Sequence, residues 1–249
     1  MKKITKDIAV EPLIAKQMTS WEVRQKLHRR LLEERAALNP WEKAYLTISR
    51  DIGSRGTEIA YEVAQQLHWQ VFDRELVEYI ATTARVRQSV IESFDEKKQS
   101  EIQTWLQTIL SHQALGTDKY LKHLLSVLLT IAEHGQSIII GRGGNFVLAS
   151  KYGLRVKITA PLEQRIQTIM GEKKIPAKEA RHFITKMDSQ RLAFIRHYFH
   201  RDADDPQAYD LVLNTAELTV PTTAAILIGA LESKLGVPRP ALPVSGTAG

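Results

Sequence analysis

The sequence contains no cysteine among its 249 residues. Disulfide bonds, thiolate metal ligands and a cysteine nucleophile are therefore excluded. The absence also fits a reducing cytoplasm, which is where we expect the protein to work. No apolar run approaches the ~20 residues of a transmembrane helix, so no membrane span is expected. Residues 1–7 are basic but are not followed by an apolar stretch, so they do not resemble a secretory signal.

The charge balance is only mildly basic, with 34 Lys and Arg against 28 Asp and Glu and a net charge of +6. Such a balance suits a ligand that carries phosphate. The chain lacks a dense Lys/Arg tract and an aromatic–basic repeat, which are typical of proteins that bind single strands. Nucleic acid is therefore not an expected partner.

One stretch organises the rest of the chain. A β-prone apolar run at residues 45–49 stops at a Gly/Ser-rich turn, and a helical pattern begins at Thr57. A strand, a glycine turn and a helix N-terminus form a geometry that binds phosphate, because glycine lets the backbone approach and the first helical N–H groups point at the anion. Gly53, Ser54, Gly56 and Thr57 are the candidate phosphate-binding residues. The alternative is an ordinary strand-to-helix turn.

The usual lysine of such a turn is missing. In the Walker pattern Gly-x-x-x-x-Gly-Lys-Ser/Thr, Thr57 takes the hydroxyl position, Gly56 stands where the lysine belongs, and Arg50 replaces the first glycine. A backbone cradle is expected here without its usual point charge.

The remaining pattern predicts an α/β fold of the three-layer P-loop NTPase type, with a five-stranded parallel sheet covered by helices on both faces and an N-terminal helical extension. The expected strands are residues 45–49, 70–72, 137–141, 154–160 and 209–214. Residues 86–134 are helical by pattern, with expected helices at 87–98, 101–113 and 118–134. Further helices are expected at 146–150, 177–200 and 221–235.

Several polar residues follow predicted strands. Asp73 comes after a short strand and is either a helix N-cap or an acid at the ligand-binding edge of the sheet. Arg142 follows the apolar strand at 137–141 and is either an anion ligand or a surface arginine that pairs with an acid. The glycines at 141, 143 and 144 resemble part of a dinucleotide fingerprint, but the third spaced glycine and the acid after the next strand are absent.

A second cluster lies after the long helix. Asp202, Asp204 and Asp205 follow His197 and His200, which suggests a metal site, but the spacing between histidines and acids is not that of a known ligand set. Turn and helix-end chemistry is the better explanation of these acids.

Residues 1–43 are expected to form an extension. Thr19 and Glu22 have the spacing of a capping box, and a helix over 21–38 would carry an apolar stripe and a basic patch. The stripe consists of Trp21, Val23, Leu27, Leu31 and Leu32, and the patch of Lys26, Arg29 and Arg30. This helix packs on the main body or on a second subunit, which makes a homodimer possible; the alternative is contact with nucleic acid or an acidic membrane. The tail at 237–249 is expected to be disordered.

Taken together, four segments resemble the cytidylate kinase-like family, relatives of the P-loop nucleoside monophosphate kinases. The resemblance runs from Tyr45 to Leu235. The segments are Ile48–Gly56 (Ile-Ser-Arg-Asp-Ile-Gly-Ser-Arg-Gly), Phe72–Leu76, Ile140–Gly143 and Asp205–Thr215. The family implies one domain at 44–236, with a helical acceptor-side region at 74–134 and a lid at 172–205.

The resemblance also implies an activity and site residues. The reaction would be transfer of the γ-phosphoryl group of ATP, with Mg²⁺, to a nucleoside monophosphate such as CMP or dCMP. The loop from Gly53 to Gly56 would cradle donor phosphates, and Thr57 would ligate Mg²⁺. Asp73 and Arg142 would lie on the acceptor side. Lid arginines would be Arg191 first and Arg165 second.

The chain departs from the family pattern in ways that affect catalysis. The missing lysine means that Arg50 or Arg55 must provide the charge, and arginine is bulkier than lysine and binds in a bidentate manner. Arg55 also replaces a glycine of the family pattern. Gly143 replaces the acid after Arg142, which leaves recognition of cytosine open. A catalytically weak nucleotide- or phosphate-binding protein with a regulatory role is therefore the alternative.

Overall fold

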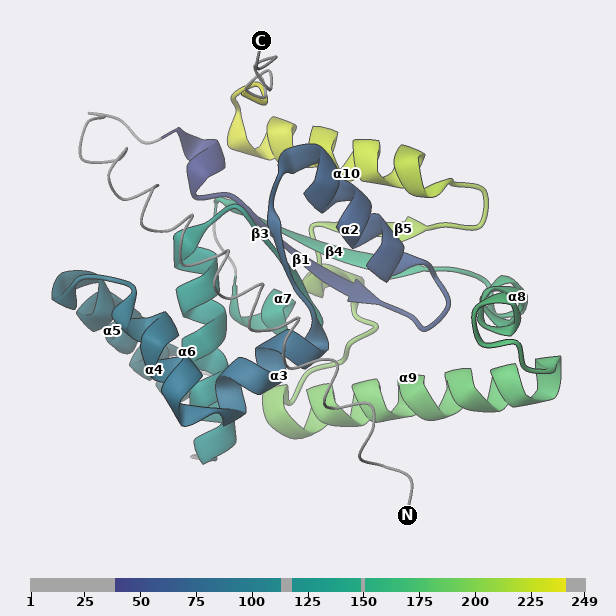
Figure 1. Cartoon of the computed structure of the whole chain (residues 1–249), viewed down its shortest axis with the longest axis horizontal. Coiled ribbons are helices and arrows are strands. Elements are labelled where there is room, and N and C mark those ends of the chain that lie inside the picture. Colours follow the sequence, from purple (N-terminus) through teal and green to yellow (C-terminus); the bar gives the residue numbers. More distant parts are fainter. Residues whose placement is uncertain (1–38, 113–117, 149–150, 241–249) are drawn as a thin grey trace, which may run out of the picture.

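A computed structural model describes residues 39–112, 118–148 and 151–240. Its centre is a five-stranded sheet in which all paired strands are parallel (Figure 1). The strands are β1 (Tyr45–Arg50), β2 (Gln70–Phe72), β3 (Ser137–Ile140), β4 (Gly153–Thr159) and β5 (Leu211–Asn214). Their order is β2-β3-β1-β4-β5. The predicted five-stranded parallel sheet is confirmed, and β1 in its middle places the following loop at the centre of the carboxyl edge.

Helices cover both faces of this sheet. In chain order they are η1 (Pro40–Glu42), α2 (Gly56–Leu67), α3 (Arg74–Thr82), α4 (Ala84–Glu92), α5 (Glu96–His112), α6 (Lys119–His134), α7 (Gly144–Val147), α8 (Leu162–Lys173), α9 (Ala177–Phe199), η2 (Pro206–Ala208) and α10 (Val220–Leu235). Helices α2 and α10 pack together on one face, and α3, α6 and α7 lie on the other (Figure 1). Helices α8 and α9 pack on each other beside the end of β1.

The alternation of side chains along the strands divides the core into two layers. Successive residues of a strand point to opposite faces. Ile138 and Ile140 of β3 therefore pack in the layer under α2 and α10, whereas Ile139 packs in the layer under α3 and α6. All three side chains are fully buried. A strand that is buried on both faces is apolar without interruption, which is why β3 has this composition.

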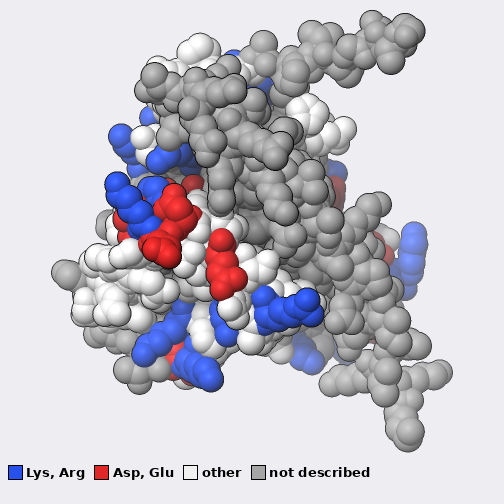
Figure 2. Space-filling model, turned by 60° about the vertical axis from the view of Figure 1, so that its left-hand side comes forward, with Lys and Arg blue, Asp and Glu red and all other residues white. Residues whose placement is uncertain are grey.

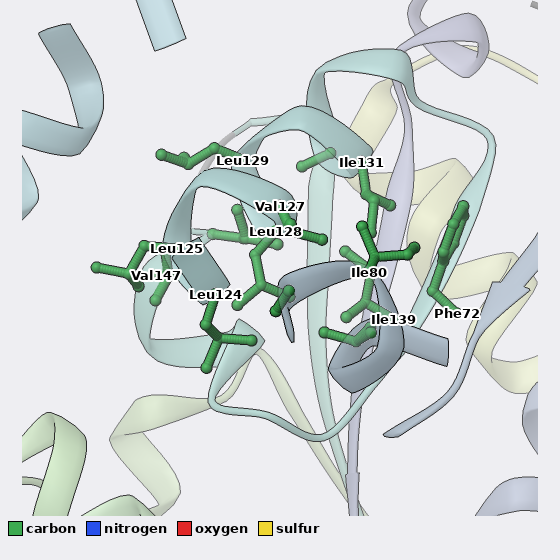
Figure 3. Close-up of a cluster of buried hydrophobic side chains, with 14 of the residues drawn as sticks. Phe72, Ile80, Leu124, Leu125, Val127, Leu128, Leu129, Ile131, Ile139 and Val147 are labelled. Atoms are coloured by element: carbon green, nitrogen blue, oxygen red, sulfur yellow. The ribbon is translucent and has the colours of Figure 1, made fainter. Parts of the chain in front are cut away.

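Helix α6 is the main element of the core layer that contains Ile139. Its apolar side chains between Leu124 and Ile131 gather with Phe72, Ile80 and Ile139 in one cluster (Figure 3). Leu124, Leu125, Val127, Leu128 and Ile131 are all fully buried. A helix that is apolar on most sides must be enclosed, and α3, α4 and α5 enclose it.

The helical region differs in part from the prediction. The expected break between 98 and 101 was wrong, because α5 runs without interruption from Glu96 to His112. The chain instead breaks at residues 93–95. There the Ser93 hydroxyl donates to the Val90 carbonyl at 2.6 Å, and the Asp95 carboxylate accepts the Lys98 N–H at 2.9 Å. Such local bonds end one helix and begin the next.

Two other boundaries moved. The helix expected at 146–150 is α7, which begins at Gly144 because Gly143, at φ 73°, adopts a left-handed conformation and turns the chain directly into the helix. The last strand begins at Leu211 rather than 209. The long helix expected at 177–200 is confirmed as α9.

Some predictions lie outside the described residues. These are the capping box at Thr19 and Glu22, the helix over 21–38 and most of the tail at 237–249. Within the part of the chain that is described, no helix is both long and apolar enough to cross a membrane.

Asp210 ties β4, β5 and α10 together. Its carboxylate accepts from the Arg155 backbone N–H at 2.9 Å, from the Arg155 guanidinium at 2.8 Å and from Lys234 Nζ at 2.8 Å. Burial alone would raise the pKa of Asp210, but these hydrogen bonds outweigh it and hold that pKa far below its usual range.

Asp210→Asn is expected to lower the unfolding free energy by about 2 kcal/mol at pH 7, because hydrogen bonds to a charged group are lost. A depressed folded-state pKa means that this contribution is complete above pH ~4 and fades as the pH falls below that value. Urea unfolding at pH 7 and pH 3 measures the difference, which should shrink at pH 3. Glu172→Gln, at an exposed position, is the control; an equal loss there, or a loss independent of pH, contradicts the prediction.

Candidate functional site

The loop between β1 and α2, residues 51–55, is held in one conformation by close contacts. Gly53 has φ 78°, and a Cβ added there would lie 2.6 Å from the Arg165 carbonyl oxygen. A Cβ on Gly56 would lie 2.5 Å from Arg50 Cβ. The buried Ser54 hydroxyl donates to the Asp51 carbonyl at 2.9 Å. We call this segment the β1–α2 loop.

The β1–α2 loop leaves the start of α2 open. Arg55 is the N-cap residue of α2, has a left-handed conformation, and makes no side-chain bond to the helix N–H groups. Free N–H groups at a helix N-terminus favour an anion. The start of α2 therefore has no side-chain cap, and the phosphate site at this loop stays a prediction.

Arg55 lies apart from the other candidate arginines. Its guanidinium pairs with Glu58 at 2.9 Å and its side chain is 45% exposed. It lines a cavity of ≈ 440 Å³ together with Gly53, Gln164 and Thr215, which we call the outer cavity. Arg50 does not line the outer cavity. The two arginines that were candidates to replace the missing lysine therefore do not share this cavity.

A second cavity, of ≈ 370 Å³, lies on the other side of the β1–α2 loop; we call it the central cavity. Cationic side chains from six parts of the chain line it: Arg50, Arg74, Arg142, Lys157, Arg165 and Arg191. Three acidic residues line it too, Asp51, Asp188 and Asp204. Among the residues that line it, positive charge therefore exceeds negative charge, as a site for a small anion requires.

Arg50 and Arg191 lie close together, and nearby acids offset their positive charges only in part. Burial, followed by the neighbouring charge of Arg191, lowers the pKa of Arg50 to about 9. Arg50 Nε is buried and has no hydrogen-bond partner among the described residues. Burial lowers the pKa of Arg191 as well; Asp188 opposes this effect and Arg74 adds to it. A bound anion would relieve the repulsion among these three guanidinium groups.

Arg191 also links α9 to the strand under the loop. Its Nη1 donates to the Arg50 carbonyl oxygen at 2.8 Å. Arg191 and Arg50 are 141 positions apart in the sequence, and only the packing of α9 below the sheet brings them together. Arg74, the first residue of α3, lies in the same cavity.

Arg142 is fixed by an acid and an aromatic ring. Its Nη2 lies 2.6 Å from the Glu78 carboxylate, and its guanidinium lies 4.9 Å from the Phe194 ring centroid. Tyr120 also donates to Glu78, at 2.8 Å. Arg142 therefore pairs with an acid, as one interpretation had it, and also lines the central cavity; its role as an anion ligand stays a prediction.

Arg165 on α8 and Asp188 on α9 connect these helices to the β1–α2 loop. Arg165 Nη1 donates to the Asp188 carboxylate at 2.6 Å and to the Ile52 carbonyl at 3.2 Å. The other carboxylate oxygen of Asp188 accepts the Ile52 N–H at 3.1 Å. These hydrogen bonds hold α8 and α9 against the backbone of the loop.

Lys157 is a cation that the sequence did not single out. It lies on β4 and pairs with Asp204, and its Nζ is 4.0 Å from Asp51. Burial alone would lower the pKa of Lys157, but the hydrogen bond to Asp204 and the charge of Asp51 raise it. Asp51 accepts in addition from Thr159 at 2.6 Å. The alternation of Arg155, Lys157 and Thr159 along β4 was the available signal, since these residues share one face.

Asp73 and Thr57 lie at two helix starts. Asp73 caps α3 by accepting the Leu76 N–H at 2.8 Å, and Tyr61 donates to it at 3.4 Å. The cap interpretation is therefore confirmed, at the carboxyl end of β2. Thr57 is exposed in the first turn of α2. Neither residue lines the central cavity.

The acids after α9 have structural partners. Asp202 accepts the Asp204 N–H at 2.9 Å, Asp205 caps η2 by accepting the Gln207 N–H at 2.9 Å, and Asp204 pairs with Lys157. No group of three or more His, Asp or Glu side chains in the described residues is arranged to hold a metal ion. Turn and helix-end chemistry, as expected, accounts for this cluster.

The sheet order and the glycine loop after the central strand define a P-loop kinase-type α/β fold. The family model described as the cytidylate kinase-like family matches residues 45–217, and the chain belongs to that family. A curated relative, the cytidylate kinase of Methanopyrus kandleri, is 30% identical over 113 residues, which cover 42% of this chain and 58% of the relative. The chain thus matches somewhat more than half of that relative's length.

Similarity to solved structures extends over most of the chain. An uncharacterized protein from Eubacterium ventriosum has a TM-score of 0.61 and 20% identity, with 77% of this chain and 99% of that chain covered, and it shares the fold. The shikimate kinase of Acinetobacter baumannii, solved with shikimate, is more distant, with a TM-score of 0.41 and 12% identity over 78% of this chain and 96% of that chain.

Proposed function

We propose that this protein is a phosphotransferase that moves the γ-phosphoryl group of ATP to a nucleoside monophosphate such as CMP or dCMP. One observation carries the proposal: Arg50, Arg74 and Arg191 converge beside the β1–α2 loop, and Arg50 and Arg74 have no ion pair among the described residues. Family membership supports the use of a nucleotide. Guanidinium groups whose charge is offset only in part, near the uncapped N-terminus of α2, suit the charge that develops on a transferring phosphoryl group.

The two cavities suggest how the substrates are arranged. The outer cavity adjoins Gly53 and Arg55 and is lined by amides and hydroxyls such as Gln164 and Thr215. These neutral groups suit the base and sugar of the donor nucleotide. Donor phosphates would then lie along Gly53, Ser54 and Gly56, and would reach the central cavity from the far side of the loop.

The acceptor would occupy the central cavity. Arg142 and Arg74 would bind its phosphate, because guanidinium groups bind phosphate in a bidentate manner. Asp73, at the end of β2, lies on the same side as Arg74 and would contact the acceptor only after a rearrangement, since it caps α3. Residues 74–134 form the helical region that we assign to the acceptor side.

Mg²⁺ would be held mainly by phosphate oxygens. The Thr57 hydroxyl fits as a protein ligand, because its side chain is exposed in the first turn of α2, where donor phosphates would lie. The ion would neutralise charge on the phosphoryl group during transfer. The protein's own part is to bind and orient both substrates and to exclude water.

Closure is assigned to residues 172–205, within the domain at 44–236. Arg191 binds the backbone at Arg50, just before the β1–α2 loop, and Arg165 binds it at Ile52, within the loop. A phosphate that binds there would compete for these donors and draw α9 inward, which would exclude water from the transferred group. Arg50 would provide the positive charge that the lysine usually provides, since Gly56 stands in the lysine position.

The second candidate is a nucleotide- or phosphate-binding regulatory protein with weak catalysis. The observation that favours it is Gly56 in the lysine position of the loop. Fixed arginines bind phosphate, but a lysine that follows the γ-phosphoryl group during transfer is absent from the loop.

A coupled assay of ADP release, with ATP and Mg²⁺ against a panel of nucleoside monophosphates, tests the proposal. We expect turnover with at least one pyrimidine monophosphate, and none with the unphosphorylated nucleosides that serve as controls. Binding of ATP in calorimetry without turnover on any acceptor would leave the regulatory protein. Absence of both binding and turnover would remove both candidates.

A further inference from the structure

A large groove lies far from the β1–α2 loop. It has a volume of ≈ 560 Å³ and runs along the amino-terminal edge of the sheet, between the starts of β1 and β4, helix α5 and the end of α6. Its apolar lining includes Tyr45, Ile102, Trp105, Leu129, Val147 and Tyr152. We call it the amino-edge groove. The proposed function does not use it.

The charges at the rim of the amino-edge groove are matched with one another. Lys98 lies 3.0 Å from Glu133 and 2.7 Å from Glu101, and Lys43 lies 3.9 Å from Glu133. From the α4–α6 side, the charged side chains of the described residues are interspersed in sign rather than gathered (Figure 2). The rim therefore has little excess charge with which to attract an ion.

Apolar surface is what the amino-edge groove offers instead. Ile102 and Leu129 are 5% and 3% exposed and lie at its base, whereas Trp105 on α5 is 58% exposed. An apolar hollow beside an exposed tryptophan is typical of a surface that receives an apolar side-chain ridge.

The described part of the chain begins close to this groove. Asn39 is fixed by the Trp41 N–H, which donates to its side chain at 3.1 Å, and Trp41 is buried and donates to the Val237 carbonyl at 3.1 Å. Four residues after Asn39, Lys43 already lines the groove. Residues 1–38 therefore join the described structure beside it, and a helix over residues 21–32 would span about 18 Å.

The sequence of that segment has the matching chemistry. Val23, Leu27 and Leu31 recur every four residues on one face of a predicted helix, with Trp21 beyond the edge of that face on the Leu31 side, and they need an apolar surface to cover them. Each such side chain gains about 1.5–3 kcal/mol on full burial. We propose that this face of residues 21–32 docks in the amino-edge groove of its own chain and braces α5 against the start of the sheet. The proposal is independent of the proposed activity, because the groove lies at the opposite edge of the sheet from the β1–α2 loop.

The protein has no cysteine of its own, so two introduced cysteines can be cross-linked without a competing thiol. In the full-length protein, Leu27→Cys combined with Thr104→Cys puts one thiol on the apolar stripe and one at the groove. We expect a short bismaleimide to link them within one chain at least tenfold faster than in two control pairs. The first control, Arg29→Cys with Thr104→Cys, moves the thiol to the polar face of the same segment. The second, Leu27→Cys with Ile226→Cys, moves the other thiol to α10.

Each outcome decides the proposal. Fast linkage in the test pair alone, with the mass of one chain, supports docking within the chain. Linkage mainly between two chains would assign the groove to a second copy and overturn the proposal. Equal rates in all three pairs would also overturn it. Circular dichroism and thermal unfolding of each double variant confirm that the comparison is made on folded protein.

Discussion

Arg50→Ala and Arg191→Ala are each expected to lower phosphoryl-transfer turnover by about 10²-fold or more. Loss of a group that stabilises transition-state charge has effects of this size. Arg50 is expected to act at the reacting phosphoryl group because its guanidinium lines the central cavity and has no ion pair among the described residues. Burial and the charge of Arg191 lower its pKa to about 9, and the charges of Glu75 and Asp73 offset this effect only in part. Steady-state kinetics with saturating ATP measure the loss of kcat.

Arg55→Ala should behave differently. Arg55 pairs with Glu58 and lines the outer cavity, so we expect a higher KM for ATP with a nearly unchanged kcat. Arg181→Ala is the surface control on α9, since Arg181 is half-exposed and pairs with Glu163. Equal kcat in the Arg50 variant and in this control would show that Arg50 does not provide the missing charge. For a protein without turnover, the same variants are compared by the Kd of ATP.

Gly53→Ala is expected to weaken ATP binding by about 10²-fold or more and to destabilise the fold. A side chain at φ 78° costs about 1–2 kcal/mol by itself. At Gly53 the new Cβ would also lie 2.6 Å from the Arg165 carbonyl, which is backbone and cannot move aside easily. The β1–α2 loop would shift, and its N–H groups would no longer converge on one anion.

Gly236→Ala is the matched control for Gly53→Ala. Gly236 has nearly the same backbone angle, φ 69°, but a Cβ added there would have no other atom within 4 Å. We expect this control to lose only the backbone contribution, about 1–2 kcal/mol, with unchanged ATP binding. Calorimetry and urea unfolding compare the two variants. Equal losses in both would mean that the contact with Arg165 has no role in shaping the loop.

Local patterns predicted most of the fold. The apolar β-branched run predicted a strand at 137–141 and the alternation predicted one at 154–160, because side-chain period is a property of neighbouring residues. The glycine turn after β1 and the absence of cysteine were likewise visible in the sequence. The break between α4 and α5 was misplaced. Ser93 ends α4 and Asp95 begins α5, each through a single side-chain hydrogen bond, and many other polar residues in the sequence could make such a bond.

The candidate site depended on the tertiary structure. Arg50 and Arg55 are five positions apart and were equivalent candidates in the sequence, but the left-handed turn at Arg55 directs it to the outer cavity. Arg74 and Lys157 were not singled out as site residues, since a single arginine or lysine carries no local signal.

The sequence by itself determined the order of strands and helices, the position of the glycine loop, the lack of its lysine and the resemblance to the family. The tertiary structure alone decided which charges meet. Arg191 contacts Arg50 across 141 positions because β1 is central in the sheet and α9 packs beneath its carboxyl end. Local periodicity reports which face of an element is apolar, whereas the convergence of cations from six parts of the chain depends on how those faces pack.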